Sequence, residues 1–203
     1  GSMKDGVRED AAIFASRQSH YCRNSIASWL GLGARNVVTV KSGADNAMRL
    51  DLLEEAVRKH VDAGGKIAAF IATLGTTDAF GLDDIEGIAR IRDALVRDYR
   101  LSYSPHIHAD AVIGWAWSVF NDYDFEQNPM GFRPRTVRAI AGAARRISKL
   151  QLADSIGVDF HKTGFCPYIS SLFLCKDRAD LNLLAREQEQ MPYLYQFGHY
   201  KPG

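Results

Sequence analysis

Five short runs of apolar residues recur along the chain and predict the strands of a sheet. They lie at residues 37–40, 67–73, 107–112, 156–160 and 169–175. Several are continuous rather than alternating, which is typical of strands that are covered on both faces. The pattern therefore favours the interior of an α/β domain over a sheet with one face in water.

Two segments between these runs have the spacing of amphipathic helices. Residues 50–61 carry apolar residues at three-to-four spacing and end near Gly64, a helix stop. Residues 83–99 begin with two aspartates, where the helix dipole favours negative charge. Strands that alternate with helices predict a mostly parallel sheet with right-handed crossovers and helices on both faces.

The last predicted strand follows the fourth after residues 163–168, a connection too short for a helical crossover. We therefore expect this pair to be antiparallel. Ligands of open α/β sheets collect at the carboxyl ends of the parallel strands. Thr76, Asp110 and Lys162 lie at or just beyond such ends, so we expect them to converge.

Composition is that of one folded domain. The chain has 203 residues, of which 46% are hydrophobic, and this length can bury a single sizeable core. With 25 basic and 24 acidic residues the net charge is +1, so no nucleic acid or membrane partner is expected. No signal peptide is visible, and no apolar run approaches the roughly 18 residues that span a membrane. Cys22, Cys166 and Cys175 form no disulfide framework, which indicates a reducing compartment and a cytoplasmic location.

Lys162 and Asp110 are the residues with the clearest candidate chemistry. A lysine at the end of a buried strand would be partly desolvated, and a neutral amine can condense with a carbonyl group. Asp110 ends another apolar run and could hold a proton on a pyridine nitrogen. Lysine plus carboxylate is the pairing that pyridoxal 5'-phosphate requires, so we expect this cofactor.

Five segments, in order along residues 13–176, make the chain similar to the pyridoxal-phosphate-dependent group II amino acid decarboxylases. This family includes the aromatic amino acid, glutamate and histidine decarboxylases, with sphingosine phosphate lyase as a relative. The resemblance implies the large domain of the aspartate-aminotransferase-like fold (fold type I). It also implies release of CO2 from an L-amino acid by a homodimer. The segments are residues 16–20, 48–56, 72–77, 108–111 and 159–162.

The resemblance also implies roles for individual residues. Lys162 falls on the family's Schiff-base lysine and Asp110 on the aspartate that contacts the ring nitrogen, while His20 matches the histidine that stacks on the ring. Further cofactor contacts are expected from a second group of positions. These are His161 on the phosphate side, Asp159 in a supporting position, Thr76 in the strand-end turn, and Val112 on the ring face opposite the histidine.

Some positions depart from the family pattern. Val112 stands where an alanine is usual, which should narrow the pocket, and Phe160 stands where proline or threonine is common. Residues 115–146 read as an aromatic link that could shape an entrance or a subunit contact. Tyr193 and Tyr195 lie near the family's proton-donating loop, although an exposed aromatic tail is the better interpretation.

The length predicts a piece of a larger enzyme. Residues 1–3 read as a cloning scar, and residues 4–203 as the central part of the cofactor-binding large domain. An upstream phosphate-binding segment and a carboxyl-terminal small domain are expected to be absent.

Three other interpretations stay open from the sequence. A carbon–carbon lyase of the sphingosine phosphate lyase type would use the same cofactor, and residues 163–167 resemble its lysine loop as well. His106, His108 and Asp110 could instead bind zinc or iron, although Pro105 suggests that His106 belongs to the preceding loop. A non-catalytic scaffold that retains the motifs is the third possibility.

Overall fold

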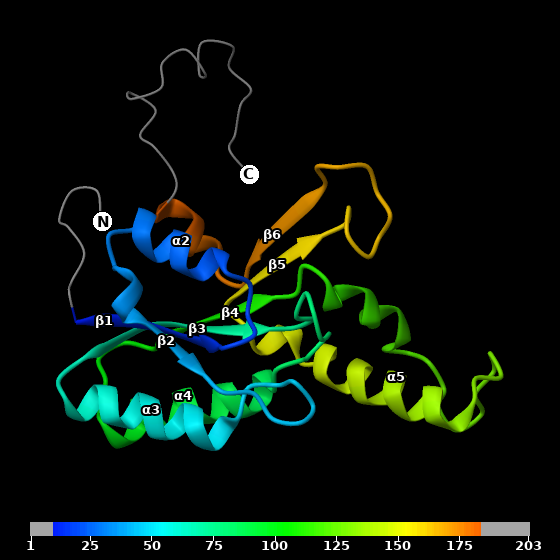
Figure 1. The fold of residues 1–203 in the computed structure, drawn as a ribbon, viewed down its shortest axis with the longest axis horizontal. Coiled ribbons are helices and arrows are strands. Elements are labelled where there is room, and N and C mark those ends of the chain that lie inside the picture. Colours follow the sequence, from blue (N-terminus) through cyan, green and yellow to red (C-terminus); the bar gives the residue numbers. More distant parts are fainter. Residues whose placement is uncertain (1–9, 184–203) are drawn as a thin grey trace, which may run out of the picture.

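The structure, a computed structural model, describes residues 10–183, which form a six-stranded sheet with helices on both faces (Figure 1). The strand order is β2-β1-β3-β4-β5-β6. All neighbours are parallel except β5 and β6, which are antiparallel, so the predicted topology is confirmed. The strands are β1 (Ala11–Ser16), β2 (Val37–Val40), β3 (Lys66–Thr73), β4 (His106–Asp110), β5 (Ser155–Asp159) and β6 (Ser171–Cys175).

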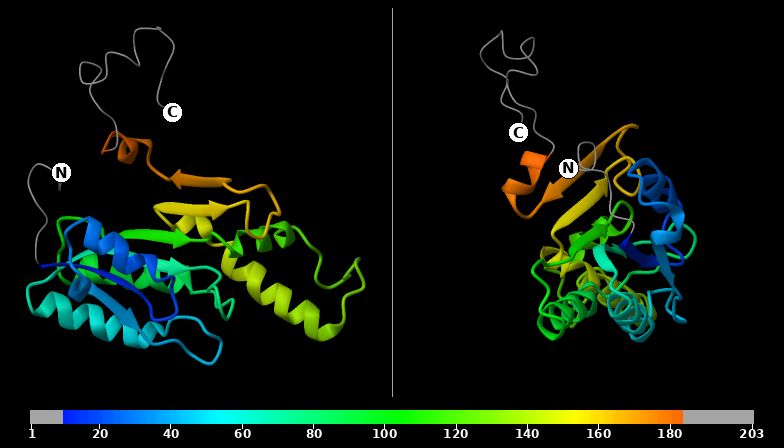
Figure 2. Two further views of the ribbon diagram at one scale, coloured as in Figure 1. Left: turned by 45° about the horizontal axis from the view of Figure 1, so that its top comes forward. Right: turned by 90° about the vertical axis from the view of Figure 1, so that its left-hand side faces the viewer.

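Within residues 10–183, four α-helices and three short 3₁₀ helices connect the strands, and a fourth 3₁₀ helix follows β6. Helices α3 and α4 lie on one face of the sheet and α2 on the other, as Figures 1 and 2 show. Both predicted helices are confirmed to within two residues at each end. The α-helices are α2 (Cys22–Trp29), α3 (Leu50–Asp62), α4 (Ile85–Asp98) and α5 (Pro134–Ile147). The 3₁₀ helices are η1 (Ala34–Asn36), η2 (Gly114–Phe120), η3 (Leu150–Leu152) and η4 (Arg178–Leu183).

Helix α4 begins where its first residues can be capped. The Asp84 side chain accepts a hydrogen bond from the backbone N–H of Gly87 at 3.2 Å, which satisfies one of the free donors of the first turn. Apolar residues at helical spacing then face the sheet, and Ile85, Ile88 and Leu95 are fully buried. The start and the buried face of this helix thus follow directly from its sequence.

Several elements differ from the expectations. Strand β1 and helices α2 and α5 were not predicted, and the expected link of residues 115–146 is mostly η2 and α5. Its aromatic residues pack on one another; Phe120, for example, lies 5.6 Å from Tyr123 between ring centroids. His106 is the first residue of β4 rather than a loop residue, because its backbone pairs with β3 opposite Ala69 despite Pro105.

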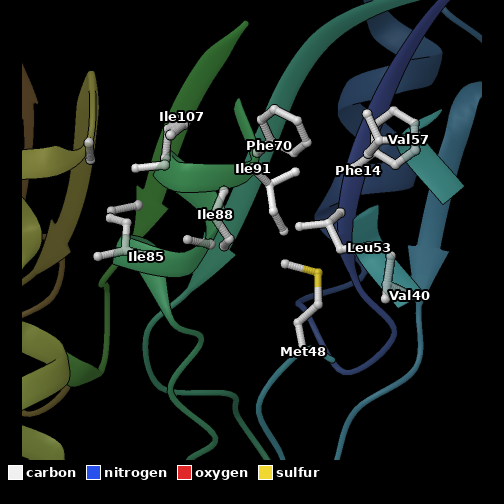
Figure 3. Close-up of a cluster of buried hydrophobic side chains, with 14 of the residues drawn as sticks. Phe14, Val40, Met48, Leu53, Val57, Phe70, Ile85, Ile88, Ile91 and Ile107 are labelled. Atoms are coloured by element: carbon white, nitrogen blue, oxygen red, sulfur yellow. The ribbon is translucent and has the colours of Figure 1, made fainter. Parts of the chain in front are cut away.

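The main core fills the space between the sheet and helices α3 and α4 (Figure 3). Phe14 of β1 and Phe70 of β3 are fully buried at its centre, with their ring centroids 5.9 Å apart. Leu53 and Ile88 reach them from the two helices. Burial of this apolar surface is the main favourable term in folding, and here it fixes the positions of the central strands.

Strand β4 divides its residues between this core and the opposite face of the sheet. Ile107 and Ala109 are fully buried in the core. His106, His108 and Asp110 alternate with them and are only partly buried. Because successive side chains of a strand point to opposite faces, the packing of the first set directs the second set away from the core.

No helix within residues 10–183 is long and apolar enough to cross a membrane.

Candidate functional site

A pocket with a volume of about 230 Å³ lies at the carboxyl ends of β3, β4 and β5. Thr76, Asp110 and Lys162 all line it, so their predicted convergence is confirmed. His20, Val112 and Asp159, also expected at the site, contribute to the same wall. The remaining lining residues are Cys22, Thr73, Gly75, Thr77 and Ile113.

Asp110 ends β4, and one of its carboxylate oxygens has no hydrogen-bond partner among residues 10–183. Its backbone carbonyl accepts a hydrogen bond from the N–H of Leu74 at 2.8 Å, which ties the ends of β3 and β4 together. Its Oδ1 is buried and makes no hydrogen bond with any residue of the described part. A buried carboxylate oxygen without a donor is costly, so the site fits a ligand that brings an N–H group, as a protonated pyridine ring does.

Lys162 follows β5 in a turn and pairs with Asp159. Its Nζ lies 2.8 Å from Oδ2 of Asp159, and the Ser171 hydroxyl donates to Oδ1 at 2.6 Å. Burial alone would raise the pKa of Asp159, but the hydrogen bonds from Lys162 and Ser171 and the charges of Lys162 and His161 outweigh it. The pKa of this carboxyl therefore lies below its ordinary value.

The expected desolvation of Lys162 is wrong for this structure. Its side chain is 39% exposed, and it is ion-paired rather than surrounded by apolar groups. The reason is that β5 ends at Asp159, so Lys162 lies in the turn beyond the buried strand. Asp159 consequently holds the amine at the edge of the pocket.

Two further residues line the pocket. His20 lies just before α2, and Val112 lies just after β4. The Nδ1 of His20 accepts a hydrogen bond from the N–H of Cys22 at 3.2 Å, and its ring lies 4.1 Å from that of Tyr21 between centroids. These contacts orient the exposed imidazole in the turn that leads from β1 into α2. Val112 follows β4, close enough to the sheet to lie 3.6 Å from a Cβ built on Gly157.

Thr76 closes a turn as well as lining the pocket. Its Oγ1 accepts a hydrogen bond from the N–H of Gly81 at 2.9 Å, and the residue is 2% exposed. The sequence left open whether one of the two adjacent threonines merely shapes the loop. The structure assigns that structural bond to Thr76, whereas Thr77 is exposed at the pocket.

His161 is not among the residues that line the pocket. Its Nδ1 accepts a hydrogen bond from the N–H of Ser170 at 3.2 Å, and its ring packs edge-on against Tyr168 at 4.6 Å between centroids. Its Nε2 lies 3.7 Å from Oδ2 of Asp159. In this arrangement His161 contacts the carboxylate that holds Lys162.

Cys22 and Thr73 are pocket residues that sequence reasoning did not single out. Burial raises the pKa of the Cys22 thiol, and the negative charge of Asp110 raises it further. Thr73 is 2% exposed, and its Oγ1 makes no hydrogen bond within residues 10–183. The position of Thr73 could have indicated its place in the pocket, because it is the last residue of β3 and pairs with Asp110 in the sheet register.

Two glycines let the chain close tightly behind the pocket. Gly75 has a φ of 107°, and a Cβ at this position would lie 2.7 Å from the backbone nitrogen of Gly114. A Cβ on Gly114 would lie 2.2 Å from the carbonyl oxygen of Leu74. Only glycine fits such contacts, and they bring the end of β3 against the start of η2.

The metal-site interpretation is wrong for the described residues. No group of three or more His, Cys, Asp or Glu side chains among residues 10–183 could hold a metal ion. His106 and His108 instead share one partner, the hydroxyl of Ser155, at 2.7 and 2.8 Å.

A larger recess of about 770 Å³ adjoins the pocket and shares His20, Thr76 and Thr77 with it. Arg17, Arg23 and Asp78 also line this recess. The pocket is therefore open on the side of α2, where a larger ligand could extend beyond it.

The sequence matches the pyridoxal-dependent decarboxylase conserved domain over residues 2–198. It is 28% identical over 206 residues to L-2,4-diaminobutyrate decarboxylase from Acinetobacter baumannii. This alignment covers 99% of this chain and 35% of that protein. It is 25% identical to aspartate 1-decarboxylase from Aliivibrio fischeri, covering 92% of this chain and 28% of that protein. The chain therefore spans about a third of the length of these relatives.

A solved structure is similar over most of the described fold. It is the glutamate decarboxylase domain of a diaminobutyrate-pyruvate transaminase and L-2,4-diaminobutyrate decarboxylase from Vibrio parahaemolyticus. The TM-score is 0.67 at 27% sequence identity, and the match covers 90% of this chain and 34% of that chain. The fold is thus that of the large domain of fold type I, as expected. Because the match to this conserved domain covers nearly the whole sequence, the chain belongs to the pyridoxal-dependent decarboxylase family.

Proposed function

We propose that the protein takes part in removing CO2 from an L-amino acid with pyridoxal 5'-phosphate held between Lys162 and Asp110. The observation that carries this proposal is the buried Oδ1 of Asp110, which has no partner among the described residues and lies in the pocket that Lys162 also lines. The family matches support the reaction class, since the named relatives are amino acid decarboxylases.

The cofactor, when bound, supplies a ring that accepts the electron pair left when a bond to the substrate's Cα breaks. The ring does so best while its nitrogen is protonated, and Asp110 is the residue that would keep this proton in place. An opposite charge in contact shifts a pKa by about one to three units, which is enough to keep the nitrogen charged near neutral pH.

Lys162 would supply the amine that attaches the cofactor and would later carry protons near the reacting carbon. Asp159, 2.8 Å from this amine, would orient it towards the pocket. His161 would act on the same carboxylate or on the phosphate side. Because Asp159 is itself held by Ser171, the amine is positioned by groups that belong to the sheet.

His20 and Val112 would form the two walls between which the ring lies, with Thr76 beside it. The imidazole is fixed by its bond from Cys22, so it can offer a flat surface to the ring. A rigid orientation matters because only the Cα bond that is perpendicular to the ring breaks readily, and the site must select the carboxylate bond. We further propose that the substrate side chain extends into the adjoining recess at α2.

Two further expectations remain part of this proposal. A homodimer is supported by the resemblance to the family. A cytoplasmic location is supported by Cys22, Cys166 and Cys175, all of which are free thiols in the structure.

A carbon–carbon lyase that releases an aldehyde is the second candidate, since residues 163–167 also resemble the lysine loop of sphingosine phosphate lyase. The named relatives favour CO2 release over it. If the protein bound no cofactor and served only as a scaffold, both candidate functions would be wrong.

Borohydride fixation tests the assignment of the amine. Pyridoxal phosphate is added to the protein, the adduct is reduced, and peptide mapping locates the label, which we expect on Lys162. Lys149, which pairs with Glu86 at 3.5 Å, provides a matched control. Lys149→Ala should leave the labelling unchanged, whereas Lys162→Ala should abolish it. Label on another residue would refute the assignment, and release of an aldehyde instead of CO2 from candidate amino acids would favour the lyase.

A further inference from the structure

Three side chains form a hydrogen-bonded chain on the face of the sheet that carries Asp110. The Nε2 of His106 lies 2.7 Å from Oγ of Ser155, and the same oxygen lies 2.8 Å from Nδ1 of His108. Ser155 is 3% exposed, so water does not compete readily for its hydroxyl. These hydrogen bonds therefore run within the sheet, from His106 at the start of β4 to Ser155 of β5 and back to His108 of β4.

The inner end of this chain reaches the neighbourhood of Asp110. The His108 ring stacks on Phe173 with centroids 6.1 Å apart and lies over Gly157, where a built Cβ would be 3.7 Å from its Nε2. Gly157 is the register partner of Asp110 across β4 and β5. His108 and Asp110 thus lie on the same face of the sheet, with no side chain at position 157, and the charge of Asp110 acts on the His108 ring.

The surroundings of His108 favour its neutral imidazole. Burial lowers its pKa, the charge of Asp110 opposes this effect, and His106 adds to the lowering. A neutral imidazole carries one proton on either Nδ1 or Nε2, and the partner of one nitrogen decides which. For His108 that partner is the Ser155 hydroxyl.

His106, at the outer end of this series of hydrogen bonds, faces a solvent-accessible recess that is lined by charged residues. His106 lines a recess of about 270 Å³ near the amino ends of the strands, together with Ser104, Asp154, Lys176, Asp177 and Asp180. Arg92 of α4 reaches Asp154 at 3.3 Å. The groups that face His106 are therefore three carboxylates, one lysine and the imidazole of His108, and those that face His108 are Asp110 and His106.

A single hydroxyl proton connects the two imidazoles. When His106 is neutral, Ser155 can donate to its Nε2 and accept the Nδ1 proton of His108, which leaves Nε2 of His108 bare. When His106 is protonated, its Nε2–H must donate to Ser155. The Ser155 proton is then free for Nδ1 of His108, and the proton of His108 moves to Nε2, on the side of Asp110.

We propose that His106, Ser155 and His108 form a relay that couples proton binding at the outer rim of the sheet to the surroundings of Asp110. His106 and Ser155 are then positioning residues. They set whether His108 presents an N–H group or a lone pair beside the carboxylate. Only the effect of the relay on a bound cofactor rests on the proposed function. The relay itself can be tested in the cofactor-free protein.

Nitrogen-15 NMR of the histidine side chains tests the relay in the cofactor-free protein between pH 5 and 8. We expect the Nε2 signal of His108 to move from pyridine-like towards pyrrole-like as His106 takes up its proton, at the same midpoint. A His108 signal that does not respond at the midpoint of His106 would overturn the proposal.

Two variants isolate the connection. Ser155→Ala removes the hydroxyl, so the response of His108 at the midpoint of His106 should be lost while both rings remain. His106→Gln keeps a polar partner for Ser155 but cannot titrate, so His108 should hold one tautomer across the range. His60→Gln is the matched control, because His60 bonds to the carbonyl of Lys66 far from this chain. Persistence of the coupled response in Ser155→Ala would also refute the relay.

A second measurement connects the relay to the cofactor. Pyridoxal phosphate is added, and the absorption of the bound cofactor is followed over the same pH range. We expect a step at the midpoint of His106 that is lost in Ser155→Ala. A bound cofactor without this step would show that the relay does not reach Asp110 and would overturn its assigned role. Failure to bind cofactor would count against the proposed function, whereas the NMR result would still decide the relay.

Discussion

The carboxylate of Asp159 joins Lys162 to the antiparallel hairpin. Oδ2 lies 2.8 Å from Nζ of Lys162, and Oδ1 accepts the hydroxyl proton of Ser171 at 2.6 Å. Ser171 begins β6 and is the register partner of Asp159. The position of the amine therefore depends on the pairing of β5 with β6, and not on the lysine turn alone.

Asp159→Asn should slow the covalent capture of pyridoxal phosphate. An amide cannot form the ion pair, and a displaced reacting group can cost about 100-fold in rate. The rate is measured by stopped-flow absorbance after the cofactor is added. Asp93→Asn is a suitable control, since Asp93 pairs with Arg92 on the exposed side of α4. An unchanged capture rate in Asp159→Asn would show that the ion pair does not position the amine.

The pH dependence of capture should reflect the same pair. Burial would raise the pKa of Asp159, but Lys162 and Ser171 hold it below its ordinary value. The ion pair is thus present above that lowered pKa and is lost only as the pH falls through it. Ser171→Ala removes one of the groups that lower the pKa, so loss of capture in acid should begin at a higher pH in this variant.

Asp110→Asn should reduce turnover far more than it reduces cofactor retention. The amide keeps an acceptor oxygen but has no charge to hold a proton on the ring nitrogen. Because an opposite charge shifts a pKa by one to three units, we expect a loss of kcat of about 10- to 1,000-fold. Turnover is followed by CO2 release and retention by cofactor absorbance after gel filtration. Comparable losses of both would indicate that Asp110 mainly holds the cofactor.

Asp83 should make the stability depend on pH. Burial raises the pKa of this carboxyl to about 6, against the bonds it accepts from the N–H groups of Met48 and Thr73. The folded state therefore holds a proton that the unfolded chain releases at lower pH, so stability falls as the pH rises from about 4 to 6. The shift corresponds to about 3 kcal/mol.

Asp83→Asn should flatten this part of the profile. The free energy of unfolding of both proteins is measured by urea denaturation at several pH values, and the difference between them isolates the contribution of Asp83. Because other carboxyl groups titrate equally in both, only that difference is informative. A constant difference between pH 4 and 6 would contradict the prediction.

Gly75→Ala and Gly142→Ala should have opposite effects. At position 75 the φ of 107° and the 2.7 Å approach to the Gly114 nitrogen leave no room for a Cβ, so we expect a loss of about 1–3 kcal/mol. At position 142, inside α5, a Cβ would meet no heavy atom within 4 Å. Alanine there should stabilise the helix by about 0.5–1 kcal/mol. Thermal unfolding compares the two, and a neutral Gly75→Ala would argue against the tight turn.

The fold was predictable where the hydrophobic pattern was strong. The central strands and helices α3 and α4 have clear apolar periods, and the short connection before β6 determined its direction. Strand β1 was missed because Ala11–Ser16 contains mostly small residues, which give a weak signal although they are almost entirely buried. Helix α5 was missed because aromatic residues and prolines ahead of it suggested an irregular link, and because most of its apolar residues are alanines, which give a weak hydrophobic signal.

The site was predictable to the extent that motifs lie at strand ends. Lys162, Asp110 and Thr76 were expected at one edge of the sheet, and His20 was expected beside the cofactor from the family resemblance; all four line one pocket. The exposure of Lys162 and the bond of His161 to Ser170 were not predictable, because both depend on the path of residues 160–170 after β5. The link between His106 and His108 was also hidden, since Ser155 is adjacent only after β4 and β5 have paired.

The alternation of β4 has a consequence for how this sequence can change. Inserting or deleting one residue between Ile107 and His108 would exchange the two faces of the strand beyond that point. His108 and Asp110 would then turn towards the core, and Ala109 would turn towards the pocket. Such a change would weaken the core and displace Asp110 from the pocket at the same time, so length variants of this strand that lose activity should also lose stability.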